Sequence, residues 1–116
     1  MSGNFYPNPP PFPLGSMGAA DSDGPWQVDC TANMYARGTT ITSIGSVITL
    51  RVDAQATGAS DIAVTGTAPA MGGLAFTFSV QARGNVAQYL LGFPLTLANG
   101  DTITRWGLLS TISYPG

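Results

Sequence analysis

Strict alternation of apolar and polar residues constrains the fold of this chain more than any other feature. Residues 74–83 (LAFTFSVQAR) are the clearest example, because Leu74, Phe76, Phe78 and Val80 occupy every second position. Successive side chains of a β-strand point to opposite faces, whereas a helix brings together residues three or four positions apart. The run therefore predicts a strand with one face buried in a core.

The same period of two recurs along most of the chain, with turn residues between the runs. In the second run, Ile48, Leu50 and Val52 are assigned to the buried face, opposite Thr49 and Arg51. Short strands at intervals of about ten residues, with no helical period, predict a small antiparallel β-sandwich of six or seven strands over residues 26–113; a barrel is the alternative. Besides residues 74–83, the predicted strands cover residues 26–34, 39–54, 61–67, 89–97 and 102–112.

Two details of the last two predicted strands concern turns and edges. Gly92 and Pro94 fall inside residues 89–97, and they predict a bulge or an edge position there. Asn99-Gly100 stands between two apolar runs, which is typical of a hairpin with a type I′ turn.

The first 25 residues differ from the rest because they hold six of the nine prolines. Proline fixes its own φ angle and restricts the preceding residue to extended geometry, so this segment is predicted to be a stiff, polyproline-like arm. The arm is either a disordered tail or a clamp on a neighbouring chain. A second short docking tail is predicted at residues 114–116. In the clamp hypothesis the partner-binding residues are Phe5, Tyr6, Pro10, Phe12, Leu14 and Tyr114.

The chemical inventory is poor, because the charged residues are four arginines and six aspartates and the chain contains no Lys, Glu or His. A Ser or Cys nucleophile needs a nearby base, so we expect a non-enzymatic protein without a cofactor. The lone Cys30 is interpreted as a small buried hydrophobe. The net charge of −2, without a basic stripe, argues against binding to nucleic acid or to an anionic membrane. The N-terminus lacks the features of a signal peptide, so we expect synthesis in a cytoplasm.

The aspartates offer no metal or catalytic signature. Asp21 and Asp23 are spaced like the start of a calcium loop, but the other ligands of such a loop are missing, so a polar hinge is preferred. A glycosidase pair would have to come from isolated aspartates on strands and turns, and no metal site is predicted. Those aspartates are Asp29, Asp53, Asp61 and Asp101.

Residues 26–113 resemble the small immunoglobulin-like (Ig-like) fibre–tail adaptor proteins of tailed bacteriophages. The resemblance is carried by GTTITS at residues 38–43, by a strand before a Gly-Gly loop at residues 62–73, and by GDTITR at residues 100–105. It implies an Ig-like sandwich present in several symmetric copies at the tail or neck, located in the virion and bound to other virion proteins.

The leading hypothesis is therefore a structural protein of a phage virion that links or reinforces neighbouring virion proteins, at the tail or at the attachment of tail fibres. A capsid decoration protein is an alternative within the same class. A carbohydrate-binding module for host adhesion is an alternative from another class, with at most a weak glycan contact, and it requires Trp106, Tyr89 and Tyr114 to form an exposed platform. Core packing is the preferred interpretation of Trp106 and Tyr89.

Overall fold

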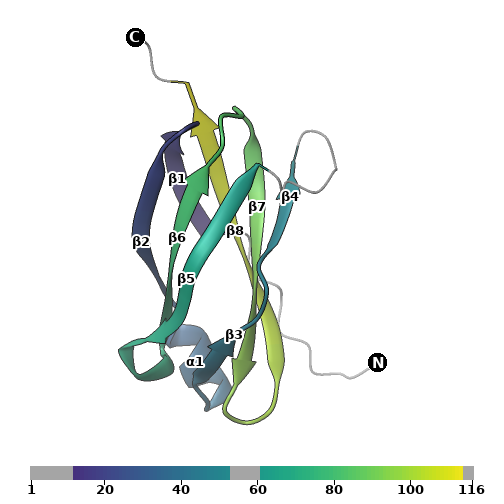
Figure 1. Ribbon diagram of the computed structural model, residues 1–116. Helices are drawn as coiled ribbons and strands as arrows, with labels where there is room; N and C mark the ends of the chain where they lie inside the picture. The colour runs from purple at the N-terminus through teal and green to yellow at the C-terminus, as the bar shows by residue number, and fades with distance from the viewer. Residues whose placement is uncertain (1–11, 53–60, 114–116) are drawn as a thin grey trace.

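Two β-sheets pack face to face in the computed structural model, which describes residues 12–52 and 61–113 (Figure 1). In the view of Figure 1 the three-stranded sheet, of order β2-β6-β5, lies in front of the five-stranded one. The five-stranded sheet has the order β1-β8-β7-β3, with β4 also pairing with β7. The described strands are β1 (Phe12–Gly18), β2 (Ser22–Asp29), β3 (Ile41–Ile44), β4 (Ile48–Arg51), β5 (Ile62–Ala70), β6 (Ala75–Ala82), β7 (Gln88–Leu97) and β8 (Thr102–Ile112), with a helix α1 (Thr31–Arg37) and a 3₁₀ turn η1 (Met71–Gly73).

The core lies between the facing sheets and follows the predicted alternation. In β6 the buried residues are Phe76, Phe78, Val80 and Ala82, as well as Ala75. The Phe93 ring of β7 packs on the rings of Phe76 and Phe78, with centroids 4.9 and 4.6 Å apart. The sequence prediction of a mostly β sandwich is thus confirmed. The alternation in β7 is equally regular, with Tyr89, Leu91, Phe93, Leu95 and Leu97 all buried.

The sandwich differs from the prediction in strand number and direction. It has eight strands in the described residues rather than six or seven, and the five-stranded sheet is mixed rather than antiparallel. The one parallel pair joins β1 to β8, with Phe12 beside Gly107 and Gly18 beside Ile112. Parallel partners can be far apart in sequence, so no local turn signal predicts such a pair.

Part of the predicted arm belongs to the sandwich. β1 lies wholly within residues 1–25, and β2 begins at Ser22, four residues before the predicted domain boundary at Trp26. A strand at a sheet edge tolerates proline because it donates hydrogen bonds on one side only. The domain therefore already includes Phe12, and of the arm residues 1–25 only 1–11 lie outside the described residues.

A helix replaces the second half of the first predicted strand. β2 ends at Asp29, whose Oδ1 accepts hydrogen bonds from the Thr31 backbone N–H (2.9 Å) and hydroxyl (2.6 Å). Helix α1 ends at Arg37 and is capped by Gly38, which has φ +64° and donates its N–H to the Tyr35 carbonyl. Cys30 and Met34 are both buried, and a spacing of four residues fits a helical face as well as a strand face. The alternation could therefore not separate the two structures.

The strand β4 faces the opposite way from the prediction. Thr49 and Arg51 pair with the buried Leu91 and Tyr89, so they point into the sandwich. Ile48 and Leu50 consequently point away from it. The sequence pattern shows that the two sets lie on opposite faces, but it does not show which face is covered.

Pro94 lies in the central strand β7, and the expected irregularity appears in the neighbouring strand. The Pro94 carbonyl accepts a hydrogen bond from the Gly45 N–H (2.7 Å). The carbonyl and the N–H of a residue in an antiparallel strand face the same neighbouring strand, so the N–H that proline lacks would also face Gly45. Residues 45–47 interrupt the edge there, between β3 and β4.

The predicted hairpin between β7 and β8 is confirmed, but its turn is not type I′. Gly100 has φ +95° and donates to the Leu97 carbonyl (3.0 Å). Asn99 does not have positive φ, since Met71 is the sole non-glycine residue with positive φ in the described chain. The turn is a three-residue loop that ends on a left-handed glycine.

Candidate functional site

The outer face of the five-stranded sheet carries a continuous row of apolar side chains. The strand register places Leu50 beside Leu90, Leu90 beside Leu108, and Leu108 beside Pro13, so one row crosses β4, β7, β8 and β1. A second row places Ile48 beside Gly92, and Gly92 beside Trp106. Leu90, Trp106 and Leu108 are half-buried. The rows line one face of the sheet, away from the core.

The edge of this face is the most exposed part. Ile48, Leu50 and Val52 keep 42, 37 and 43% of their surface exposed. Contiguous apolar exposure of this kind is uncommon on isolated domains and typical of surfaces that bind another protein. We call this surface the apolar sheet face; it comprises Pro13, Ile48, Leu50, Val52, Leu90, Trp106 and Leu108.

No outward position of the described β4, β7 and β8 holds a charged side chain. Arg51 and Arg105 lie in these strands, but their register partners Tyr89 and Phe93 are buried in the core, so both arginines are on the inner side. Apart from the apolar sheet face, the outward residues are Gln88, Gly92, Pro94, Thr96, Thr102, Thr104, Ser110 and Ile112.

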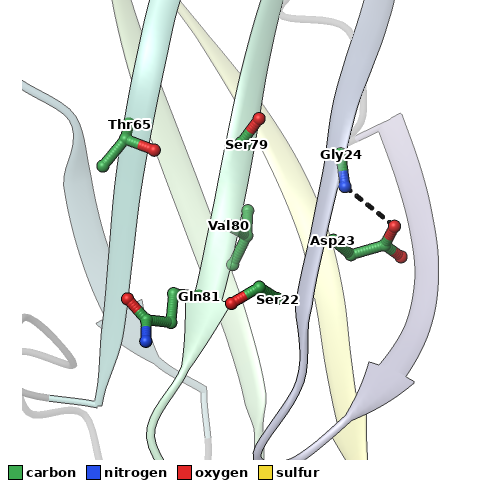
Figure 2. Close-up of a pocket in the computed structure, with 7 residues that line it drawn as sticks. All are labelled: Ser22, Asp23, Gly24, Thr65, Ser79, Val80 and Gln81. Carbon is green, nitrogen blue, oxygen red and sulfur yellow. Dashed lines mark hydrogen bonds between the residues drawn. The ribbon is translucent and has the colours of Figure 1, made fainter.

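The outer face of the three-stranded sheet is polar instead. Figure 2 shows Ser22 and Asp23 of β2, Ser79 and Gln81 of β6, and Thr65 of β5 around a shallow hollow of about 260 Å³. Hydroxyl and amide groups of this kind are readily solvated. The two outer faces of the sandwich are therefore chemically different.

The predicted partner anchors Phe12 and Leu14 are half-buried and pack against the protein's own core. The Phe12 ring lies 6.4 Å from the Phe93 ring and 6.5 Å from the Phe76 ring. It also occupies the space over Gly107, where an added Cβ would meet Phe12 at 2.6 Å and Leu14 at 3.1 Å. Both side chains thus stabilise β1 on the sandwich, and a role for them in binding a partner stays a prediction. The other predicted anchors, Phe5, Tyr6, Pro10 and Tyr114, lie outside the described residues.

The aromatic residues considered for glycan binding do not form a row. Tyr89 is completely buried (0% exposed), whereas Trp106 lies on the outer face with its ring over Gly92. Tyr114 lies outside the described residues. Core packing was therefore correct for Tyr89, but Trp106 belongs to the apolar sheet face.

A small polar cluster connects β4, β5 and β7 at the side of the core. The Tyr89 hydroxyl donates a hydrogen bond to Asp61 Oδ2 (3.0 Å), and Arg51 Nη1 lies 3.6 Å from the same oxygen. Burial, together with the hydrogen bond to Asp61 and its negative charge, raises the pKa of Tyr89 above its ordinary value. These contacts satisfy the polar groups of the three side chains beside the core. The cluster contains no nucleophile placed next to a base.

The remaining titratable candidates have local structural roles. Hydrogen bonds from the Thr31 side chain and backbone hold the pKa of Asp29 below its ordinary value. Cys30 is buried, and this burial raises the pKa of its thiol. Asp101 accepts a hydrogen bond from the Asn99 side chain (3.2 Å) in the hairpin loop. Within residues 12–52 and 61–113, no group of three or more Cys or Asp residues is arranged to hold a metal ion, and no helix there is long and apolar enough to cross a membrane.

The apolar sheet face was not identified from the sequence. Its signal was present in the alternating Ile48, Leu50 and Val52, but it was assigned to the core. Comparison with protein-family models, with curated proteins and with solved structures finds no match to this chain.

Proposed function

We propose that this chain is a non-enzymatic structural protein of a bacteriophage virion, which links neighbouring virion proteins at the tail or at the attachment of its fibres. The single observation that carries the proposal is the uncharged apolar sheet face, opposite a polar outer face. A surface of this kind gains free energy when a protein partner removes it from water. Its position on a sheet holds the contacting side chains in a rigid arrangement.

We further infer that the sandwich is Ig-like. With β1 as strand A and the interrupted edge β3–β4 as strand C, the three-stranded sheet has the order B-E-D and the other sheet contains C-F-G. The same two groups of strands characterise the immunoglobulin fold. This order agrees with the resemblance to Ig-like fibre–tail adaptors, which rests on the turn and strand motifs of residues 26–113.

Particle composition tests the proposed function. Virions produced by the genome that encodes this chain are purified and the protein is quantified by mass spectrometry against the major capsid protein. About a dozen copies or fewer support a tail or neck position, whereas hundreds indicate the alternative role of capsid decoration. A protein that is absent from purified particles contradicts both roles.

Glycan binding is tested separately with Trp106→Ala. The glycan hypothesis expects this variant to keep its fold and to lose binding on a glycan array. The structural role expects no glycan binding by the unmodified protein.

A further inference from the structure

We propose that the apolar sheet face binds residues 4–11 (NFYPNPPP) of a second copy of this chain. The inference deepens the proposed function, because it names the partner of the same surface. Phe5, Tyr6 and Pro10 then bind a neighbouring copy, as the clamp hypothesis requires, while Phe12 and Leu14 attach the arm to its own sandwich.

The two surfaces match in charge and in chemistry. Residues 4–11 contain no charged side chain, and neither do the outward positions of the described β4, β7 and β8. The segment offers four prolines and two aromatic rings, and the sheet face offers Trp106 among aliphatic side chains. Proline-rich segments are commonly recognised by such aromatic and aliphatic surfaces, because they lose little conformational entropy on binding.

The direction of the chain favours a second copy over the segment's own sandwich. β1 runs parallel to β8, and its first residue, Phe12, lies beside Gly107. The row formed by Leu108, Leu90 and Leu50 lies on the Ile112 side of Gly107. A segment of the same chain that covers this row must reverse its direction, whereas the row of Ile48, Gly92 and Trp106 lies on the Thr102 side of Gly107.

Such a reversal conflicts with the proline pattern. Each of residues 6–13 is either a proline or the residue before one. Proline fixes its own φ angle and disfavours helical geometry in the residue before it, so this stretch favours an extended path over a reversal. Residues 4–11 can reach the sheet face of a neighbouring copy without such a reversal.

The segment is long enough for the surface. Eight residues in polyproline geometry span about 25 Å, at about 3.1 Å per residue. The row across β4, β7, β8 and β1 covers three strand spacings, or roughly 14 Å. Residues 4–11 are therefore long enough to span the whole row.

Two full-length variants with complementary defects test the proposal. The arm variant, Phe5→Ser with Tyr6→Ser, keeps the sheet face, and the face variant, Leu50→Asp, keeps the arm. Leu50 is an exposed residue of an edge strand, so its substitution leaves the core unchanged. The matched control, Thr65→Asp, places the same carboxylate on the polar outer face. Circular dichroism verifies that each variant is folded.

Light scattering after size-exclusion chromatography measures the mass of each species over a concentration series. We expect the unmodified protein and the Thr65→Asp control to form dimers or larger closed assemblies. Each defective variant is expected to be monomeric, with association at least about tenfold weaker, because an apolar contact is lost or a carboxylate is left unpaired in the interface. An equal mixture of the two variants should restore a heterodimer, since one supplies the face and the other the arm.

Three results overturn the proposal. A monomeric unmodified protein shows that residues 4–11 do not bind a second copy. Dimers of the arm variant alone show that two sheet faces pair directly. Failure of the folded variants to complement each other shows that arm and face are not partners. None of these results changes the particle-composition test, so the proposed function and this inference fail independently.

Discussion

The indole ring of Trp106 occupies the space that a side chain at Gly92 would need. The two residues are register partners on β8 and β7, and a Cβ built at Gly92 would lie 2.7 Å from the Trp106 ring. Because Gly92 has no side chain, the Trp106 ring can lie against the sheet at this position. The ring thereby forms part of the apolar sheet face.

Gly92→Ala is expected to displace the indole and to destabilise the fold by about 1–3 kcal/mol, the usual cost of added volume at a packed site. Gly92 has no positive φ, so the effect is steric rather than conformational. Tryptophan fluorescence, measured in a Trp26→Phe background that isolates Trp106, should shift to the red. An unchanged spectrum and stability would show that the ring does not lie over this position.

Phe12→Ala should loosen β1 and lower the free energy of unfolding by about 2–3 kcal/mol, less than for a fully buried phenylalanine because Phe12 is only half-buried. Gly107→Ala should loosen the same strand by expelling the ring from above the backbone. Amide hydrogen exchange of residues 14–18 measures both effects. Pro13→Ala is the control, because Pro13 lies on the outer face; equal exchange in all three variants contradicts the packing of Phe12.

Limited proteolysis locates the N-terminal boundary of the stable domain. Because β1 pairs with β8 and β2 pairs with β6, no cleavage is expected between Phe12 and Trp26. The N-terminus of the stable fragment, found by mass spectrometry, gives the boundary. A stable fragment that begins near Trp26 would show that β1 is not part of the stable domain.

Tyr89→Phe should cost about 1 kcal/mol near neutral pH through the lost hydrogen bond to Asp61. The folded-state pKa of Tyr89 is raised, so the protein favours the protonated phenol. This contribution to stability is fully present below the pKa of the unfolded tyrosine, about 10, and is lost as the pH rises through the folded-state pKa.

The difference in unfolding free energy between Tyr89→Phe and the unmodified protein should therefore shrink above about pH 10. Urea unfolding at pH 7 and at alkaline pH measures this difference. A constant difference across that range would exclude a titration of Tyr89.

Cys30 should resist modification by a thiol reagent in the folded protein and react at once after unfolding. Its side chain is 3% exposed, and burial disfavours the reactive thiolate. Ellman's reagent, with and without guanidinium chloride, measures the two rates. Fast modification of the folded protein would place the thiol at the surface.

The sequence by itself determined the class of fold and the orientation of its most regular strands. Phe76, Phe78 and Val80 in β6, and Leu91, Phe93 and Leu95 in β7, are large residues in strict alternation, and only the core can accommodate them. The hairpin from β7 to β8 was equally predictable, because Gly100 supplies a left-handed residue at a local turn. These features depend on neighbours in the sequence.

Only the tertiary structure decided which face of β4 is covered, whether residues 31–37 form a helix, and where Phe12 packs. Ile48, Leu50 and Val52 have the pattern of a buried strand, but the register with β7 places Thr49 and Arg51 inside. There Asp61, the residue before β5, pairs with Arg51. Cys30 and Met34 fit a strand or a helix equally well, and Phe12 becomes a core residue through a parallel pair with β8, far along the chain. The apolar sheet face was hidden for the same reason: its residues come from four strands, and only long-range pairing brings them onto one surface.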